Sequence, residues 1–288
     1  MFVPVNLPNE RDRMREFADR WSVTLDASSI ETASSLIGFG VRRGHRVALK
    51  IVKRPGDEWH AGSVTRAFHG RAVVHVLEID DGAVLLEQAI PGTSLVDVVA
   101  AGDDDLATSI IGGVMRDLSP GEPPVGVRTV EHWGGAFERY RATGDRHIPR
   151  SLIDDAGSLY GALCTSQTNR RLLHGDLQHS NVLFDAERGW IAIDPKGVIG
   201  EPEVEVGPFL RNPAYASWLF DNQSVIERRL RLLCETAGLR YERALRWSFA
   251  LAVLSAIWTV EDDGVVHDDN PALMLAGALR SSIDRARS

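Results

Sequence analysis

One block in the second half of the chain, LHGDLQHSNVLFDAERGWIAIDPKG at residues 173–197, constrains the fold more than any other feature. Asp176 and Asn181 lie five positions apart, and Asp194 follows thirteen positions after Asn181. Two short apolar runs between Asn181 and Asp194, separated by a Gly-containing turn, predict a β-hairpin. The block therefore predicts that a loop and the far end of a hairpin bring three polar side chains together.

These three side chains are the groups that phosphoryl transfer from a nucleotide requires. A carboxylate must orient and deprotonate the acceptor hydroxyl, and oxygen ligands must hold Mg²⁺ against the phosphates. Kinases also place the Asp of their catalytic loop five positions before its Asn. We therefore assign Asp176 as the catalytic base, and Asn181 and Asp194 as the Mg²⁺ ligands. Each residue alone is commonly a cap or a turn residue, but the set with two strands between its members favours chemistry.

The predicted secondary structure changes character once, near residues 88–92. Strands dominate before that point and helices after it. This order predicts an α+β, bilobal protein-kinase-like fold, with a strand-rich nucleotide-binding lobe at residues 1–88 and a mainly helical lobe at residues 89–288. The predicted strands are Arg46–Val52, Ala72–Glu78 and Ala83–Gln88, and the predicted helices include Ser94–Ala100, Asp104–Leu118, Leu152–Thr168, Ser224–Ala237, Tyr241–Val260 and Pro271–Arg285, with Ser94 and Asp103 as N-caps.

A lysine in the apolar run Val47–Val52 is the candidate ligand of the nucleotide phosphates. Lys50 occupies the position of the strand lysine that contacts the α- and β-phosphates in kinases. Burying a lysine without an anionic partner would be costly. Its ion-pair partner is expected on the next helical segment, with Glu58 as the first candidate and Asp57 as the second. Either acid could instead be a first-turn charge that favours the helix dipole.

Two further segments are predicted to contact the nucleotide. Residues 36–45 contain three glycines and are expected to cover the phosphates, although they lack the full kinase glycine pattern. The hinge that binds adenine through backbone groups is predicted at Glu87, Gln88 and Ala89. ATP is accordingly the predicted phosphate donor.

Composition and charge narrow the class of protein. A formal net charge of −8 and a sequence pI near 5.6 disfavour a nucleic-acid binder, which needs an excess of Lys and Arg. Cys164 and Cys234 lack the spacing of a disulfide framework or a zinc site. The first residues carry charges where a signal peptide has its apolar core, and the longest apolar stretch, Phe249–Val260, is too short to span a bilayer. We therefore expect a cytoplasmic protein with no membrane partner.

Two departures from the protein-kinase pattern indicate another branch of the fold. Gly175 stands in place of the loop arginine, and Pro195-Lys196 replaces Phe-Gly after the metal-binding Asp. These features resemble the aminoglycoside phosphotransferase family, whose loop typically reads HGDxxxxN. The stretch AIDPKGVIGEPEVEVGPFLRN, residues 192–212, is similar in particular to the streptomycin 6-kinase and hydroxyurea phosphotransferase group. The resemblance implies ATP-dependent phosphorylation of an aminoglycoside hydroxyl, and hence antibiotic inactivation.

The acceptor is expected to bind in the helical lobe, because its groups must converge on Asp176. Seven acids are candidates to attract a cationic aminoglycoside, and an ordinary solvated acidic surface is the alternative. They are Glu201, Glu203, Glu205, Asp262, Asp263, Asp268 and Asp269.

Four other residues near the predicted site leave alternatives open, and two histidines lie within the catalytic block itself. Trp247 and Trp258 share nearly one face of a helix, where core packing is the alternative to stacking on a ligand. Arg211-Asn212 either brace the loop after Asp194 or face the acceptor. His174 is expected to brace the catalytic loop, and His179 is not assigned as a metal ligand.

The leading hypothesis is an ATP-dependent O-phosphotransferase that acts on a small-molecule hydroxyl, with streptomycin as the example acceptor. Kinases of sugars, choline, homoserine or amino alcohols share this loop and remain an alternative. A non-catalytic nucleotide-binding pseudokinase is disfavoured because the base Asp, the Asn, the metal Asp and the strand Lys are all present. A protein kinase is disfavoured because no activation segment ending in Ala-Pro-Glu follows Asp194.

Overall fold

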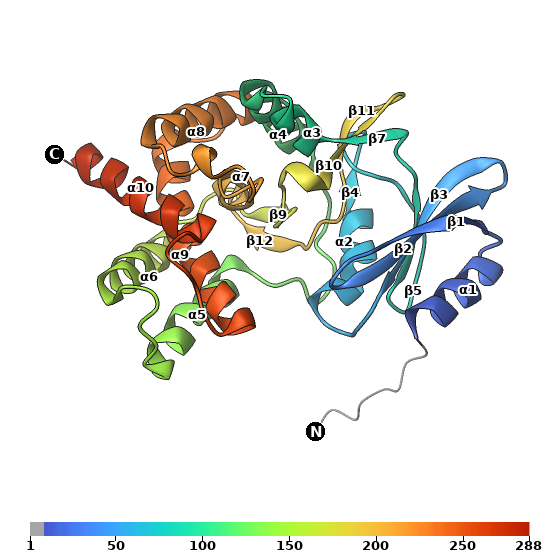
Figure 1. Ribbon diagram of the computed structural model, residues 1–288, viewed down its shortest axis with the longest axis horizontal. Helices are drawn as coiled ribbons and strands as arrows, with labels where there is room; N and C mark the ends of the chain where they lie inside the picture. Colours follow the sequence, from blue (N-terminus) through green and yellow to red (C-terminus); the bar gives the residue numbers. More distant parts are fainter. Residues whose placement is uncertain (1–8, 288) are drawn as a thin grey trace.

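The N-terminal third of the chain forms one antiparallel sheet, and the remainder is mainly helical (Figure 1). In this computed structural model, which describes residues 9–287, the strand order of the sheet is β1-β2-β3-β6-β5. The elements of this part are α1 (Glu10–Arg20), β1 (Thr24–Glu31), β2 (Ser35–Arg42), β3 (His45–Val52), the 3-10 turn η1 (Asp57–His60), α2 (Ala61–Ala67), β4 (Phe68–His69), β5 (Val76–Asp80) and β6 (Ala83–Glu87).

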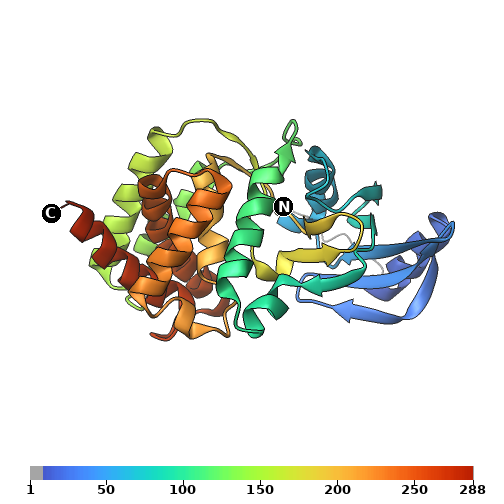
Figure 2. The same ribbon diagram turned by 90° about the horizontal axis from the view of Figure 1, so that it is seen from above.

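Helices and three short sheets make up the rest of the chain, which the view from above separates clearly from the first sheet (Figure 2). The elements in order are β7 (Pro91–Ser94), α3 (Leu95–Ala100), α4 (Asp104–Asp117), β8 (Ser119–Pro120), α5 (Val130–Thr143), α6 (Arg150–Thr165), β9 (Arg171–Leu173), η2 (His179–Asn181), β10 (Val182–Asp185), β11 (Gly189–Ala192), β12 (Val198–Gly200), η3 (Pro202–Glu205), α7 (Val206–Leu210), η4 (Ser217–Leu219), α8 (Gln223–Ala237), α9 (Tyr241–Asp263) and α10 (Pro271–Arg287).

Strand β3 shows why both faces of the first sheet are covered. Side chains alternate between the two faces of a strand. Leu49 and Ile51 pack in a buried cluster with Phe17 of α1. Ala48 and Lys50 point to the opposite face, where they line a cavity. The apolar run that contains Lys50 is therefore buried on both sides, as predicted, and α1 supplies a cover that the sequence analysis did not anticipate.

The segment expected to cover the phosphates is a strand pair instead. Residues 36–45 belong to β2 and β3, which pair continuously and turn only at residues 43–44. The glycine at position 40 serves close packing, because a Cβ there would clash with the backbone oxygen of Thr24 in β1. Ile30 of β1 and Ile37 of β2 line the same cavity as Lys50. Phe39 of β2 lines it too, so the predicted segment does border this cavity, as a strand and not as a loop.

The predicted strand Ala72–Glu78 is shorter than expected. Only its second half belongs to β5, which begins at Val76. The first half crosses to the other part of the molecule, where Val73 forms an isolated parallel bridge with Ala192 and the N–H of Val74 donates to the oxygen of Ala192 at 2.9 Å. These residues tie the sheet to the hairpin β10–β11, so their apolar sequence serves an interlobe contact.

Most predicted elements of the second part are confirmed. The hairpin is β10–β11, and the predicted helices coincide with α3, α4, α6, α8, α9 and α10 to within a few residues. Ser94 and Asp103 cap α3 and α4 by accepting hydrogen bonds from the N–H groups of Val96 and Leu106, each at 3.2 Å. Helix α5 was not predicted. The division into lobes at residues 88 and 89 stays a prediction.

Helix α9 forms the centre of the helical part. It packs against α5, α6, α7, α8 and α10, and a helix that is apolar on all sides is normally buried in this way. By length and composition the whole helix could cross a membrane, with a mean hydropathy of 1.2 over an 18-residue window, although its uninterrupted apolar stretch Phe249–Val260 is shorter. However, 67% of the most apolar 18-residue window of this helix is buried inside the structure, as in the core helix of a globular protein.

Candidate active site

The predicted catalytic loop, residues 174–181, lies between β9 and β10 and is braced by a buried histidine. His174 donates from Nε2 to the backbone oxygen of Ile193 at 2.9 Å, and its Nδ1 accepts the N–H of Asp176 at 3.3 Å. Burial lowers the pKa of His174, so the ring stays neutral and can make both bonds. Gly175 adopts a φ of 79°, which favours glycine over the arginine of protein kinases. His174 therefore braces the loop, as expected.

Asp176 lies at the wall of a polar cavity. Its side chain is 14% exposed, and Lys196 Nζ lies 3.3 Å from one carboxylate oxygen. The amide nitrogen of Asn181 donates to the backbone oxygen of Asp176 at 2.8 Å. This bond turns the amide oxygen of Asn181 away from the loop and leaves it available as a ligand. The carboxylate of Asp176 is thus held in place at a surface that a small molecule can reach.

Asn181 and Asp194 are linked through the end of the hairpin. The N–H of Ile193 donates to the backbone oxygen of Asn181 at 2.9 Å, which places Asp194 beside the catalytic loop. Asp194 has a φ of 57°, an unusual conformation for a residue with a side chain, and its carboxylate is 43% exposed. One amide oxygen and one accessible carboxylate match the hard oxygen donors that Mg²⁺ prefers. The described residues 9–287 contain no group of three His, Cys, Asp or Glu side chains arranged for a metal.

Lys50 joins the sheet to the catalytic block. Its Nζ is ion-paired with Asp194 and lies 3.8 Å from the carboxylate of Glu58 in η1. The side chain of Lys50 is only 7% exposed, so both acids offset the free energy of burying its charge. The side chain of Asp57, the second candidate partner, lies outside the described residues. The structure therefore brings together Lys50, Glu58 and Asp194 from three separate segments.

The cavity beside Lys50 has the character of a nucleotide-base site. It measures about 390 Å³ and is lined mainly by apolar side chains, together with the hinge residues Glu87, Gln88 and Ala89. The N–H groups of Glu87 and Gln88 already donate to the backbone oxygens of His75 and Arg46, at 3.0 and 3.2 Å. Among the hinge residues, all of which the structure describes, only the Ala89 N–H has no acceptor within the protein. The hinge thus presents one free backbone donor to a ligand.

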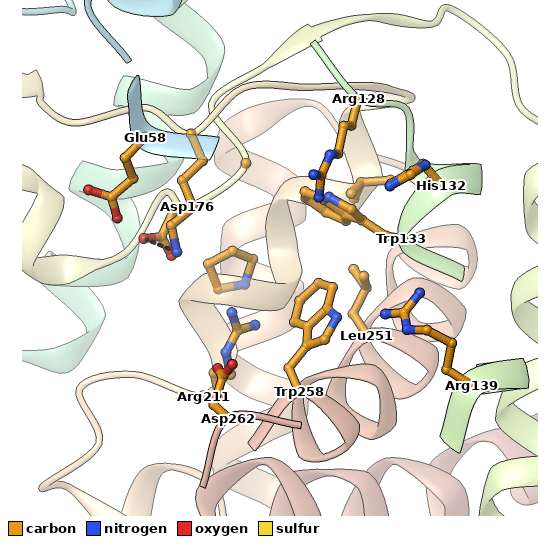
Figure 3. Close-up of a pocket in the computed structure, with 14 residues that line it drawn as sticks. Glu58, Arg128, His132, Trp133, Arg139, Asp176, Arg211, Leu251, Trp258 and Asp262 are labelled. Carbon is orange, nitrogen blue, oxygen red and sulfur yellow. Dashed lines mark ion pairs between the residues drawn. The ribbon is translucent and has the colours of Figure 1, made fainter. Parts of the chain in front are cut away.

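A second, polar cavity of about 540 Å³ lies on the other side of Asp176 (Figure 3). In the figure Asp176 and Glu58 are at one side of the cavity, and Trp133, Leu251 and Arg139 are at the other. The lining residues are Glu58, Arg128, His132, Trp133, Arg139, Gly175, Asp176, Lys196, Val204, Pro208, Arg211, Leu251, Trp258 and Asp262. This cavity is where an acceptor hydroxyl can reach the carboxylate of Asp176.

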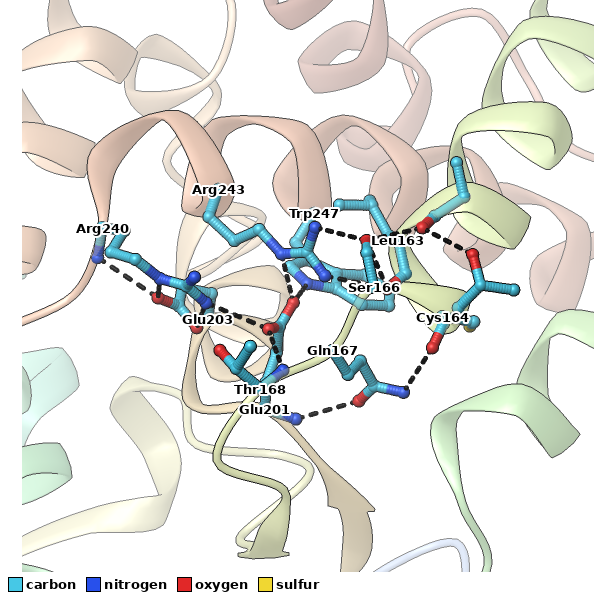
Figure 4. Close-up of polar contacts among 12 residues, drawn as sticks. Leu163, Cys164, Ser166, Gln167, Thr168, Glu201, Glu203, Arg240, Arg243 and Trp247 are labelled. Carbon is cyan, nitrogen blue, oxygen red and sulfur yellow. Dashed lines mark hydrogen bonds and ion pairs between the residues drawn. The ribbon is translucent and has the colours of Figure 1, made fainter.

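Three of the acids expected to attract an acceptor are buried and bonded instead. Glu201 and Glu203 are ion-paired with Arg240, and Glu201 also accepts hydrogen bonds from Arg243 at 2.5 Å and from Trp247 (Figure 4). Glu205 accepts the N–H of Gly175 at 2.8 Å. Neither the solvated surface nor acceptor attraction describes these residues, because their partners at the start of α9, on α9 and at Gly175 hold them inside.

The location of each side chain decides the alternatives left open for the two tryptophans, the acids near the end of α9 and Arg211-Asn212. Trp247 is fully buried in the core, whereas Trp258 is partly exposed and lines the polar cavity. Of the four acids near the end of α9, only Asp262 lines that cavity. Arg211 faces the cavity too, while Asn212 donates to the backbone oxygen of Pro208 at 2.9 Å and so braces the loop. Burial lowers the pKa of Arg211, and the negative charge of Asp176 opposes that effect.

Two features of the site escaped the sequence analysis. Trp133 and Arg139 come from α5, a helix that was not predicted, so their contribution to the cavity could not be seen. Lys196 stands in the Asp-Pro-Lys-Gly motif, two residues after Asp194, and this position was the available signal. His179 is fully buried, stacks on Phe209 and has a pKa lowered to about 3 by burial, so it is a neutral packing residue.

The chain is similar to known kinases along most of its length. The sequence pattern of the family described as aminoglycoside/hydroxyurea antibiotic resistance kinase matches residues 20–264. A streptomycin 6-kinase of Streptomyces glaucescens is 32% identical over 280 residues, which cover 93% of this chain and 88% of the relative. A streptomycin 3″-kinase of Klebsiella pneumoniae is 30% identical over 251 residues, covering 85% and 91%. A solved choline/ethanolamine kinase family protein from Mesorhizobium loti shares the fold, with a TM-score of 0.66 at 15% identity over 96% of this chain and 97% of that chain.

Proposed function

The chain belongs to the aminoglycoside/hydroxyurea antibiotic resistance kinase family, and from this premise we propose that its acceptor is an aminoglycoside, with streptomycin as the first candidate. Membership makes the chain an ATP-dependent phosphotransferase that acts on a hydroxyl group of a small molecule, with the protein-kinase-like fold. The pseudokinase alternative is therefore set aside. Streptomycin comes first because both relatives described above are named as streptomycin kinases.

One observation carries the assignment of roles. Lys50 lies in the apolar cavity, and its ion pairs with Asp194 and Glu58 reach the border of the polar cavity that contains Asp176. A donor in the first cavity and an acceptor in the second would meet at these residues. The size of the polar cavity, about 540 Å³, falls in the range for drug-sized ligands and favours an aminoglycoside over the much smaller hydroxyurea.

The nucleotide would be held mainly by the sheet. Adenine would enter the apolar cavity and receive a hydrogen bond from the Ala89 N–H, at the hinge formed by Glu87, Gln88 and Ala89. Lys50, positioned by Glu58, would contact the phosphates. This arrangement would direct the γ-phosphate toward Asp176, and such positioning supplies a large part of the rate enhancement in phosphoryl transfer.

Asp176 is the proposed catalytic base. Its carboxylate would accept the proton of the acceptor hydroxyl, while Lys196, 3.3 Å away, holds it in place. The oxygens of Asn181 and Asp194 fit Mg²⁺ as ligands, and the ion would neutralise charge on the phosphates when bound. Since ATP is the donor, a cytoplasmic location is part of the proposal.

The test is phosphorylation of streptomycin by the purified protein with ATP and Mg²⁺, followed by ³¹P NMR, which also distinguishes a 6-phosphate from a 3″-phosphate. Asp176→Asn should lower kcat by about a thousandfold or more while leaving ATP binding nearly intact, because the side chain keeps its shape and loses its proton acceptor. Wild-type turnover by Asp176→Asn would contradict the assigned base. Phosphorylation of choline, homoserine or hexoses, with none of streptomycin, would contradict the proposed acceptor.

A further inference from the structure

One stripe of helix α9 faces the acceptor cavity. Leu251, Trp258 and Asp262 are spaced by seven and four residues, which places them on the same side of a helix, and all three line the cavity. The next acid, Asp263, lies off this stripe and does not line the cavity. Helix α9 thus presents an indole and a carboxylate, one turn apart, to whatever binds beside Asp176.

Trp258 is held in a defined orientation. Its ring meets that of Trp133 at an interplanar angle of 89° with 5.6 Å between the ring centroids. A perpendicular contact of this kind uses the edge of one ring and one face of the other. At least one face of the Trp258 indole therefore remains uncovered by Trp133, and in Figure 3 the indole projects from α9 into the cavity.

Asp262 is the acid of this cavity that is not already ion-paired. Glu58 pairs with Lys50, and Asp176 pairs with Lys196. Within the described residues 9–287, the side chain of Asp262 has no ion pair or hydrogen bond. The neighbouring Glu261 is the acid that binds Arg139, through two hydrogen bonds of 2.9 and 3.1 Å. The carboxylate of Asp262 is therefore available to a ligand.

Two cations of the cavity, Lys196 and Arg211, accompany Asp176. Lys196 contacts Asp176 directly, and the electrostatic partner of the partly buried Arg211 is also Asp176. Arg128 and Arg139 line the cavity as well, and Arg139, on the side of Trp133 and Leu251, is already paired with Glu261 of α9. Trp258 and Asp262 thus offer an aromatic face and a free carboxylate on one stripe of α9, to which a positively charged group of an acceptor can bind while its hydroxyl lies at Asp176.

We propose that Trp258 and Asp262 form a subsite for a planar cationic group of the acceptor, a guanidinium, which stacks on the indole and pairs with the carboxylate. A guanidinium suits this pair because it is flat, weakly hydrated and able to form parallel hydrogen bonds with a carboxylate. An ammonium gains the cation–π attraction but not the stacking. This inference rests on the proposed function and names the chemical group through which this site selects its acceptor.

The test measures binding and turnover separately. Streptomycin, which carries guanidinium groups, and kanamycin, which carries only ammonium groups, are titrated into the protein while tryptophan fluorescence is followed, and KM and kcat are then measured with ATP. Trp258→Leu and Asp262→Asn should each raise the Kd and KM for streptomycin about tenfold, with the KM for ATP unchanged. Asp263→Asn is the matched control and should change neither constant. Trp258→Phe should restore part of the affinity.

The outcomes separate this inference from the proposed function. Streptomycin affinity that is unchanged in both Trp258→Leu and Asp262→Asn would overturn the subsite even if the enzyme phosphorylates streptomycin. An equal loss of kanamycin and streptomycin affinity would overturn the choice of a guanidinium, as would an absence of streptomycin binding to the wild-type protein. Binding that weakens as expected, without any phosphorylation, would support the subsite and contradict the proposed acceptor. Thermal melting of each variant at the wild-type temperature verifies the fold.

Discussion

Glu201 and Glu205 lie four residues apart in one buried segment, yet their carboxylates have opposite surroundings. Glu201 is fully buried and accepts hydrogen bonds from the side chains of Arg243 and Trp247 and from the N–H of Thr168, so both of its oxygens are used. Glu205 accepts one bond, from the N–H of Gly175, and its other oxygen is buried without a hydrogen-bond partner. Both oxygens of Glu201 thus have partners, two of which are arginines, whereas only one oxygen of Glu205 has a partner.

The difference shows that the neighbouring groups of a buried acid determine whether its pKa is raised or lowered. Burial raises the pKa of Glu205 to about 7, although the Gly175 bond opposes this. Burial acts in the same direction on Glu203, but the bonds from Arg240 outweigh it and the net pKa is lowered. The pKa values of Glu203 and Glu205, two residues apart, are therefore shifted in opposite directions. The arginine-bonded end anchors the segment to α9, while the Glu205 end contacts the catalytic loop.

The largest expected effect comes from removing the arginine-bonded anchor. Glu201→Ala should lower the free energy of unfolding by about 3–5 kcal/mol, because the half-buried Arg243 and the buried indole N–H of Trp247 lose their partner. Urea denaturation at neutral pH measures the change. The matched control is Glu235→Ala, which removes an exposed glutamate of α8 and should change stability by less than about 0.5 kcal/mol. Equal losses in the two variants would show that Glu201 is not an anchor.

The second effect is a pH dependence whose sign distinguishes Glu205 from Glu203. The folded pKa of Glu205, about 7, exceeds the ordinary 4.5, so the folded state binds the proton more tightly between these values. The stability from that proton is fully present below pH 4.5 and is lost as the pH rises through 7, by up to about 3 kcal/mol. Glu203 has the opposite sign, because its lowered pKa gives stability that is lost on acidification.

A comparison of the wild-type protein with Glu205→Gln isolates the contribution of the Glu205 carboxyl to the pH dependence of stability. Urea denaturation of the wild-type protein and the variant at pH 5 and pH 8 gives the difference in stability at each pH. The variant should gain stability relative to the wild type at pH 8, since it buries no charge there. A difference that is the same at both pH values would show that Glu205 does not titrate in this range.

The same contrast explains what the sequence could and could not predict. The catalytic loop and the capped helices follow from local patterns, because Asp176, Asn181 and Asp194 lie within one block and Ser94 and Asp103 precede their own helices. The roles of Lys50 and Asp194, 144 positions apart, were predicted only because a known kinase pattern relates them.

The wrong predictions depend on distant partners. Glu201 resembled a surface acid because Arg240, Arg243 and Trp247 follow it by about forty residues, and no local pattern links them. Acidic residues are rarely buried unless they are paired, so the surface was the reasonable expectation. Part of the lining of the polar cavity was missed for a related reason, since Trp133 and Arg139 belong to a helix that was not predicted, whereas Arg211, Trp258 and Asp262 were among the candidates.

The smallest expected effect is on catalysis, and it tests whether Glu205 positions the loop that carries Asp176. Glu205→Ala should lower kcat roughly tenfold with the KM for ATP unchanged, because the N–H of Gly175 loses its acceptor and the loop that carries Asp176 is less well positioned. Glu205→Gln keeps an oxygen for that bond and should retain most of the activity. Steady-state kinetics at pH 7 compares the two variants, with thermal melting to confirm that both are folded. If Glu205→Gln loses as much activity as Glu205→Ala, the hydrogen bond to Gly175 is not what positions the loop, and both ends of the segment are then purely architectural.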